Sequence, residues 1–466
     1  MTDAKTANGH DYDITVIGGG PGGYVAAIKA AQLGKKVCLV EEAVVGGTCL
    51  NFGCIPTKTL IKTVNLFSEI KSAEKFAIAG LDADGLQVCM SKLQERKQAV
   101  ISRLVAGVSG LLVAGGVTFE QGHARFLDRY TIESSNKNIT SDYFIIATGS
   151  SVFMPPFIDI SEAENLMTSK QALSLEHVPA SVIIIGGGVI GIEFAYILHK
   201  LGSRVTVVEL MDTILPMVDA EISDLCKRNM TSHGVKFING SAVRKIRGNT
   251  VIYSLNGEEQ FLEAAAVLMA VGRVPNATGL NLEAIGMEMD EKAIKTDDSL
   301  RTNIDNIYAV GDVNGKVMLA HTASHEGLFA VANICGQAQK MQYEQIPSCI
   351  YIEPEVASIG LTEDQAREKY GDIRIGKFPM LANAKSLIAG DSSGMMKIVL
   401  SADDRILGAH LYCQNATDII GELAVAMAAG AKADVVIKAV HPHPTFCEGI
   451  PEAFMSASFG RAIHAR

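Results

Sequence analysis

The chain has 466 residues, a formal net charge of −10 and a hydrophobic content of 48%, as expected of a large globular protein with about three domains. Its acidic balance, without any lysine or arginine cluster, argues against binding to a nucleic-acid backbone. Charged residues interrupt each apolar stretch before it reaches the roughly 18 residues of a membrane span, so we expect no membrane partner.

Nine cysteines in a chain without a signal-peptide pattern indicate a reducing compartment rather than a framework of structural disulfides. The first eleven residues are polar and lack the pattern of a transit peptide, so we expect a short loose tail and a cytoplasmic protein. Apart from Cys49 and Cys54 the cysteines are scattered singly, which does not fit a zinc site, and no metal is expected.

The first recognisable motif is a strand, a glycine-rich turn and a helix in residues 13–33. Gly18, Gly20 and Gly23 fit the pattern G-x-G-x-x-G. In this pattern the first glycine permits a tight turn, the second lets the backbone approach a pyrophosphate, and the third packs the helix against the strand. The next buried strand ends at Glu41, where an acid would hold a ribose hydroxyl. The full set predicts a dinucleotide site.

Directly after this motif comes a pair of cysteines, Cys49 and Cys54, bracketed by Gly46, Gly47 and Gly53. Residues five apart on a regular helix are too far apart for a disulfide, so a bond between them requires a distorted backbone. A bridge in distorted geometry is easily reduced, which favours a redox-active disulfide. Two unpaired core thiols and half of a metal site remain as alternatives.

The strand, glycine turn and helix are repeated in residues 181–209, with Gly186, Gly188 and Gly191 as the glycines and Glu209 at the end of the second strand. This internal repeat predicts a second dinucleotide-binding domain. A carboxylate at Glu209 would accept a ribose hydroxyl and repel a 2′-phosphate, and no arginine follows it in the loop, so NAD is favoured over NADP. Glu209 is otherwise an ordinary exposed acid.

Two further motifs carry chemistry. A strand ends at Asp312, which fits a contact to a polyol or ribityl chain, or else a turn cap. From about residue 346 the pattern becomes antiparallel, with alternating strands at 394–401 and 405–413. Near its end His443 precedes Glu448 by five residues, and a histidine held by a carboxylate is a natural general base, although a structural histidine is the common alternative.

Taken together, these motifs resemble those of the dihydrolipoamide dehydrogenases, within the pyridine nucleotide-disulfide oxidoreductases, and the resemblance covers nearly the whole chain. It rests on both glycine motifs with their acids and on these further residues: Gly47-Thr48-Cys49 to Lys58, Ala147-Thr148-Gly149, Glu193, Gly272-Arg273, Gly311-Asp312 and His443 with Glu448. The fold it implies is α/β, with two Rossmann-like dinucleotide-binding domains and a C-terminal α+β interface domain. The boundaries are 1–150 and 276–346 for the FAD-binding domain, 151–275 for the NAD-binding domain and 347–466 for the interface domain.

The resemblance also implies cofactors, partners and roles. FAD binds the first unit and NAD the second, and the chain forms a homodimer in which His443, oriented by Glu448, serves the partner subunit's disulfide. Cys54 lies against the flavin, Cys49 exchanges with dihydrolipoamide carried by a lipoyl domain of a multienzyme complex, and Lys58 pairs with Glu193. The remaining expected cofactor contacts are Gly47, Thr48, Lys58, Ala124, Thr148, Gly149, Asp312, Met318, Ala320, His321 and Gly272.

The chain departs from the family pattern at Phe52, Thr57 and Cys447, none of which removes a catalytic group. Glutathione and trypanothione reductases would require arginines after the second acidic strand, and mercuric reductase would require a terminal cysteine pair; both are lacking in the sequence. A reductase of another small NAD-linked disulfide is the alternative enzyme. A non-catalytic subunit is disfavoured because both cysteines and His443 are present.

Overall fold

In the computed structural model, residue 6 and residues 8–465 are described. The predicted loose tail therefore lies largely outside the described residues. The chain divides into two compact units. Unit 1 comprises the segments Met1–Thr59, Gln94–Phe153 and Gly272–Met341, and unit 2 comprises Leu60–Leu93, Met154–Val271 and Gln342–Arg466.

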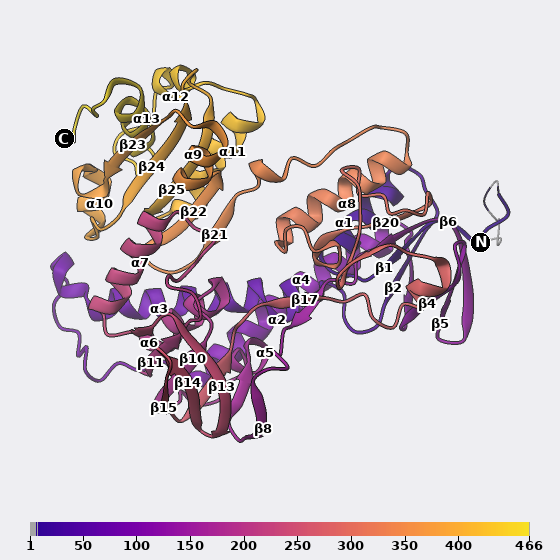
Figure 1. Ribbon diagram of the computed structural model, residues 1–466, viewed down its shortest axis with the longest axis horizontal. Helices are drawn as coiled ribbons and strands as arrows, with labels where there is room; N and C mark the ends of the chain where they lie inside the picture. Colours follow the sequence, from indigo (N-terminus) through magenta and orange to yellow (C-terminus); the bar gives the residue numbers. More distant parts are fainter. Residues whose placement is uncertain (1–5, 7, 466) are drawn as a thin grey trace. The chain divides into compact units, whose positions relative to one another are not determined.

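Unit 1 is built on a parallel sheet in the order β3-β2-β1-β6-β20, and β6 continues into an antiparallel meander with β5 and β4 (Figure 1). Helices α1 and α8 pack against each other beside this sheet. The elements of unit 1 are β1 (Tyr12–Ile17), α1 (Pro21–Gln32), β2 (Val37–Glu41), α2 (Gly47–Phe52), β3 (Thr118–Gln121), β4 (Ala124–Asp128), β5 (Thr131–Ser134), β6 (Lys137–Ile146), β7 (Ser150–Val152), β17 (Arg273–Pro275), η2 (Leu282–Ile285), β18 (Met289–Asp290), β19 (Ala293–Ile294), β20 (Ile307–Ala309), η3 (Gly311–Asn314) and α8 (Ala320–Ile334).

Unit 2 holds a second parallel sheet, in the order β12-β11-β10-β16-β9, with its own antiparallel meander β13-β14-β15. The two sheets repeat the same plan: β10, β11 and β12 correspond to β1, β2 and β3. These elements are β8 (Asp159–Ala163), β9 (Leu166–Thr168), α5 (Ser169–Ala172), β10 (Ser181–Ile185), α6 (Val189–Lys200), β11 (Arg204–Val208), α7 (Ala220–Ser232), β12 (Lys236–Ile238), β13 (Ser241–Gly248), β14 (Thr250–Leu255), β15 (Glu258–Glu263) and β16 (Ala266–Met269). The predicted internal repeat is therefore present.

The C-terminal part of unit 2 is an antiparallel sheet in the order β21-β22-β25-β24-β23. Its elements are η4 (Tyr343–Gln345), β21 (Ser348–Ile350), β22 (Glu355–Gly360), α9 (Glu363–Tyr370), β23 (Ile373–Pro379), η5 (Met380–Ala382), α10 (Ala384–Ala389), β24 (Met395–Ser401), β25 (Ile406–Cys413), α11 (Ala416–Ala428), α12 (Ala433–Lys438) and α13 (Gly449–Phe459). The predicted antiparallel pairing of β24 with β25 is confirmed. The predicted alternation of burial is wrong, because every residue of both strands is buried. Helices α11 and α13 and helix α7 pack against these strands.

Two long helices each contain a position at which the chain passes from one unit to the other. They are α3 (Cys54–Lys71) and α4 (Met90–Ala114), and the short helix η1 (Ala73–Phe76) lies between them in the sequence. Among the described residues, α4 is long and apolar enough by length and composition to cross a membrane, although Lys97 and Arg103 interrupt it. A single helix of this kind is weak evidence for a membrane span.

Candidate functional site

The first glycine turn has the conformation that its sequence predicts. Gly18 has φ 102°, and a Cβ added there would lie 2.4 Å from the carbonyl oxygen of Ala147. A Cβ on Gly23 would lie 1.8 Å from the carbonyl oxygen of Gly18, so α1 packs tightly on β1 only with glycine there. A Cβ on Gly20 would have Gly47 Cα, at 3.9 Å, as its nearest neighbour within the described chain. The middle glycine thus presents an open face.

The second glycine turn repeats this arrangement in unit 2. Gly186 has φ 109°, and a Cβ on Gly191 would lie 2.0 Å from the carbonyl oxygen of Gly186. No atom of the described residues comes within 4 Å of a Cβ built on Gly188. Gly20 is the N-cap residue of α1, and Gly188 is the N-cap residue of α6. Because glycine has no side chain, neither residue caps the first backbone amides of its helix. Both turns therefore fit a pyrophosphate approaching a helix N-terminus.

The acids at the strand ends brace these turns. Glu41 accepts hydrogen bonds from the amide of Gly19 at 2.6 Å and of Ala43 at 2.8 Å. Glu209 accepts from the amide of Gly187 at 2.5 Å and of Met211 at 2.8 Å. Each carboxylate ties the glycine turn to the loop after the second strand. Sequence reasoning assigned the acids to a ribose hydroxyl and did not predict this bracing, which leaves further lone pairs for such a contact.

The cysteine segment forms two helices with a break between the sulfurs. Helix α2 ends at Phe52, α3 begins at Cys54, and Gly53 between them has φ −140° and ψ −113°. The expected distortion of the backbone is therefore present. The segment also packs on the first glycine turn, because a Cβ on Gly47, which has φ 55°, would lie 2.6 Å from Gly20 Cα. The cysteine pair is thus held beside the pyrophosphate turn of unit 1.

The two thiols interact with each other. The pKa of Cys49 is raised well above its usual range, first by a hydrogen bond with Cys54 and then by burial, while the charge of Lys58 lowers it. Lys58 therefore lies within electrostatic reach of the pair. Cys54 is the more exposed of the two thiols and Cys49 is half-buried. This exposure does not by itself identify the thiol that meets the substrate, so the assignment of Cys49 to substrate stays a prediction.

A polar cluster in unit 1 joins the predicted Asp312 to Arg273, a motif residue without a predicted role, and to Ser150, which sequence reasoning did not select. Arg273 Nε donates to Ser150 Oγ at 2.7 Å, its guanidinium also donates to the Ser150 carbonyl at 2.5 Å, and its Nε lies 3.9 Å from Asp312. Ser150 Oγ donates to Asp312. Burial lowers the pKa of Arg273, while the charges of Asp312 and Cys54 raise it, so this cluster lies within electrostatic reach of the redox pair. The Arg273 side chain is only 18% exposed, so Arg273 is not a surface arginine.

The predicted contacts around Asp312 lie on two consecutive elements, η3 and the start of α8. Asp312 lies in η3 near the N-terminus of α8, and Met318, Ala320 and His321 lie at that N-terminus. Buried Glu326 holds the turn by accepting from the Gly311 amide at 2.5 Å. A single acid inside a helix gives no sequence signal for this role, so Glu326 was missed.

Of the other predicted cofactor residues of unit 1, Thr148, Gly149 and Gly272 lie on two connections, Ala124 lies on β4 and Thr48 lies on α2. Thr148 Oγ1 donates to the carbonyl of Asn276 at 2.6 Å, and it precedes Gly149, which has φ 71°. Gly272 has φ 124° and precedes the short strand β17, which pairs with β7. Ala124 is buried in the core on β4, so it offers a ligand at most its backbone. Thr48 is exposed on α2.

In unit 2, Glu193 is buried on α6 and accepts from the backbone amide of Tyr351 at 3.1 Å. Its predicted partner Lys58 belongs to unit 1, on α3. Their pairing stays a prediction.

His443 and Glu448 form the predicted pair in unit 2. His443 Nδ1 lies 2.8 Å from Glu448 Oε1, and the imidazole is 72% exposed. Glu448 Oε2 also accepts from the Thr445 amide at 2.7 Å. Burial raises the pKa of Glu448, but the bonds from Thr445 and His443 outweigh it and lower the pKa. The ionised carboxylate fixes the ring and leaves Nε2 to take a proton. Cys447 Sγ lies 3.1 Å from Thr445 Oγ1 in the same turn.

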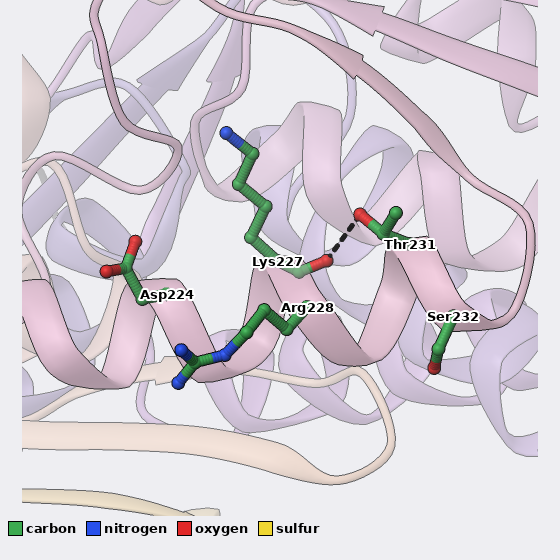
Figure 2. A pocket seen from close by; sticks show the side chains of 5 residues that line it. All are labelled: Asp224, Lys227, Arg228, Thr231 and Ser232. Atoms are coloured by element: carbon green, nitrogen blue, oxygen red, sulfur yellow. Dashed lines mark hydrogen bonds between the residues drawn. The ribbon is translucent and has the colours of Figure 1, made fainter.

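A shallow depression of about 510 Å³ lies along one polar face of α7, lined by Asp224, Lys227, Arg228, Thr231 and Ser232 (Figure 2). Figure 2 shows these side chains rising from a single helix, with Thr231 donating to the Lys227 carbonyl at 2.7 Å. It contains none of the predicted site residues. We interpret it as a solvated helix face rather than as a binding site.

Comparisons with known proteins agree with this geometry. The chain matches the family pyridine nucleotide-disulphide oxidoreductase over residues 12–327 and the dimerisation domain of the same family over residues 346–454. A dihydrolipoyl dehydrogenase of Bacillus subtilis is 39% identical over 97% of this chain and 99% of its own length. The mitochondrial dihydrolipoyl dehydrogenase of Pisum sativum is 37% identical over 98% and 94%. The solved structure of the HOCl-induced flavoprotein disulfide reductase RclA from Escherichia coli has a TM-score of 0.84 and 28% identity, covering 95% of this chain and 99% of that chain.

Proposed function

We propose, from the premise that this chain belongs to the pyridine nucleotide-disulphide oxidoreductase family, that it oxidises dihydrolipoyl groups with FAD as bound cofactor and NAD as final acceptor. The observation that carries the proposal is the cysteine pair, placed on two helices that meet at Gly53 and packed against the first glycine turn. The duplicated glycine turn with Glu209 supplies the second nucleotide site, and the absence of an arginine in the loop after it favours NAD.

In the proposed reaction His443 Nε2 takes the proton of one substrate thiol. The resulting thiolate attacks Cys49 Sγ, the Cys49–Cys54 bond breaks, and Cys54 leaves as a thiolate. The second substrate thiol, deprotonated in turn, attacks the first substrate sulfur. This attack closes the cyclic disulfide and releases Cys49. The substrate has then lost two electrons to the cysteine pair. FAD, when bound, supplies the two-electron transfer from the reduced pair to NAD.

Three parts of the protein support these steps. Glu448 holds Nδ1 of His443, so the other nitrogen is the one that accepts the proton. The hydrogen bond with Cys54 and burial raise the pKa of Cys49, and the charge of Lys58 opposes this rise. The open faces of Gly20 and Gly188 and the cluster of Arg273, Ser150 and Asp312 would hold the two nucleotides. Arg273 would contribute a positive charge near the site of reduction.

We further propose that the chain acts as a homodimer in the cytoplasm and receives its substrate on a lipoyl-carrying protein, without a membrane or nucleic-acid partner. The match of residues 346–454 to a dimerisation domain supports the dimer. The acidic net charge of −10 argues against a nucleic-acid partner.

A steady-state assay tests the activity. Purified protein with bound FAD should form NADH from dihydrolipoamide and NAD, and NADP should be a poor substitute. Anaerobic titration with dihydrolipoamide should produce the long-wavelength thiolate–flavin band in the wild type but not in Cys54→Ser. If no NADH forms while FAD stays bound, the proposal is rejected in favour of a reductase of another small disulfide.

A further inference from the structure

Ser150 lies in unit 1 between a cation and an acid. Arg273 Nε donates to Ser150 Oγ at 2.7 Å, and Ser150 Oγ donates to Asp312 Oδ2. Ser150 is only 5% exposed, so water competes little for these bonds. The proposed function uses the three residues as one polar cluster and gives Ser150 no task of its own. The order of the two bonds defines such a task.

The chemistry of the groups fixes the direction of both bonds. A guanidinium group only donates, so Ser150 Oγ is the acceptor toward Arg273. A hydroxyl has a single hydrogen, and Asp312 Oδ2 is the acceptor that this hydrogen reaches. Arg273 also donates from a second nitrogen to the Ser150 carbonyl at 2.5 Å. Arg273 therefore holds Ser150 by its side chain and its backbone, and it directs the hydroxyl hydrogen to Asp312.

Asp312 is held through one of its two carboxylate oxygens. Oδ2 accepts from Ser150 and lies 3.9 Å from Arg273 Nε. No hydrogen bond between described residues involves Oδ1, and the Asp312 side chain is 22% exposed. Each oxygen of a carboxylate can accept hydrogen bonds. Oδ1 is therefore the oxygen that can receive a hydroxyl group of a ligand.

The sheet places Asp312 along the same edge as the first glycine turn. Strand β6 lies between β1 and β20, and Ile17, Ile146 and Ala309 are register partners at the ends of these strands. The glycine turn follows β1, and Asp312 follows β20. Neighbouring strands are about 4.8 Å apart, so two spacings separate the turn from Asp312 by about 10 Å. A polyol chain that extends from a pyrophosphate can span this distance.

The packing of helix α1 also brings the two turns together. A Cβ on Gly22, at the start of α1, would lie 3.2 Å from Val310 Cγ2 and 3.2 Å from the Ala323 carbonyl oxygen. Val310 precedes Asp312 by two residues, and Ala323 lies at the start of α8. The helix whose N-terminus fits a pyrophosphate is thus in direct contact with the segment that carries Asp312.

We propose that Ser150 is a positioning residue for the bound flavin: clamped by Arg273, it engages Oδ2 of Asp312 and so presents Oδ1 to a hydroxyl of the ribityl chain of FAD. This inference rests on the proposed contact between Asp312 and FAD, and it names the residue that orients that contact. Without the Ser150 hydroxyl the Asp312 carboxylate is held less firmly, and ordering it when FAD binds costs free energy. Ser150 therefore strengthens FAD binding through Asp312.

The rate at which FAD leaves the purified holoenzyme measures this role, and flavin fluorescence after dilution follows it. Ser150→Ala removes the hydroxyl. Ser151→Ala removes the adjacent exposed hydroxyl, which donates to Asn276 Oδ1 at 2.7 Å, and is the matched control. We expect FAD to leave Ser150→Ala about ten times faster than the wild type, near the lower end of the effect of a hydrogen bond to a charged group. Ser151→Ala should release FAD at the wild-type rate. A wild-type rate in Ser150→Ala would overturn the proposal.

A double-mutant cycle distinguishes positioning from a general effect on the fold. If Ser150 acts through Asp312, Ser150→Ala should accelerate release by about twofold or less when Asp312→Ala is already present. An equal acceleration with and without the Asp312 carboxylate would show that Ser150 acts on the fold instead, and the proposal would be rejected.

A second comparison keeps Asp312 and changes the ligand. The wild type should bind FAD more tightly than the same dinucleotide without its ribityl hydroxyl groups, and Ser150→Ala should discriminate between the two about ten times less. Equilibrium exchange of the two dinucleotides measures this ratio, and an unchanged ratio in Ser150→Ala contradicts the inference. None of these measurements uses dihydrolipoamide or NAD. A wild type that binds FAD but does not oxidise dihydrolipoamide therefore rejects only the proposed function, so the two failures are distinguishable.

Discussion

At the scale of single residues, the His443–Glu448 pair makes a direct prediction. Glu448 uses one oxygen for His443 and the other for the Thr445 amide, so Glu448→Gln keeps an acceptor but loses the charge that favours the imidazolium. We expect kcat/KM to fall about 100-fold, at the lower end of the range for general acid–base catalysis. Steady-state kinetics with dihydrolipoamide measures this.

The pH dependence of this pair has a definite sign. Because the pKa of folded Glu448 is lowered, its stabilising contacts are present above the ordinary carboxyl pKa and are lost only as pH falls through the lower folded value. Loss of activity at a pH above the ordinary carboxyl pKa should therefore not come from protonation of Glu448. The control is Glu452→Gln, the same change one helical turn further along α13, which should leave the acid limb in place. A wild-type rate in Glu448→Gln would contradict the assigned role.

The residue scale also shows how far sequence reasoning reaches. The glycines of both turns, the cysteine pair and His443 with Glu448 were found because each belongs to a pattern with fixed spacing. The contact between Arg273 and Ser150 was not predicted, because it depends on β17 pairing with β7 across more than a hundred residues of chain. Glu326 was missed for a different reason: its partner is the backbone amide of Gly311, and a single acid inside a helix gives no sequence signal for such a contact.

At the scale of elements, the close approach of α1 and α8 predicts the effect of one methyl group. A Cβ on Gly327 would lie 2.4 Å from the carbonyl oxygen of Gly22, which cannot move without displacing α1. We expect Gly327→Ala to destabilise the protein by about 1–3 kcal/mol, as overpacking does. Thermal unfolding of the FAD-loaded protein should show a lower Tm.

The matched control is Gly107→Ala, on the exposed helix α4. None of the described residues has an atom within 4 Å of a Cβ built there, so alanine should stabilise the helix by about 0.5–1 kcal/mol. Equal Tm changes in the two variants would show that α1 and α8 are not in the close contact described.

The types of the elements, helix or strand, were predicted more successfully than the burial of their faces. Glycine turns and apolar runs specify strand, turn and helix locally, which is why both nucleotide-binding repeats were recognised. The burial of β24 and β25 on both faces was not predicted, because it depends on α11, α13 and α7, which reach the sheet from distant parts of the chain. Lys397 on β24 is an example, since a charged residue in a strand favours an exposed face.

At the scale of the whole molecule, Lys397 joins the C-terminal sheet to the N-terminus of α7, the helix between β11 and β12 of the second nucleotide-binding sheet, within unit 2. Its Nζ lies 2.8 Å from Asp219, 2.9 Å from Glu363 and 3.2 Å from Glu221, and its side chain and that of Asp219 are 3% and 2% exposed. Lys397→Met leaves the buried Asp219 carboxylate without its cation. We expect a loss of about 3–5 kcal/mol of stability, as for other broken buried ion pairs.

The stability difference should depend on pH. Burial lowers the pKa of Lys397, but its three carboxylates outweigh this and raise it, so its contribution is present below the unfolded lysine pKa and is lost as pH rises through the folded value. Asp219 has a lowered pKa despite burial, chiefly through Lys397, so its contribution is lost as pH falls. Thermal unfolding should separate wild type from Lys397→Met most between about pH 5 and pH 10. Lys369→Met, which breaks the exposed pair with Glu344, should leave Tm unchanged.

The proposed homodimer makes the last prediction, because it divides one active site between two chains. Cys54→Ser abolishes the redox pair and His443→Gln removes the base, so each variant alone should be inactive. If His443 serves the partner's cysteines, a heterodimer of the two variants has one site with both defects and one intact site. Random reassortment makes half of the dimers hybrid, so the mixture should recover about one quarter of wild-type activity. A base that served its own chain would leave every site defective, and the mixture would stay inactive after the subunits exchange.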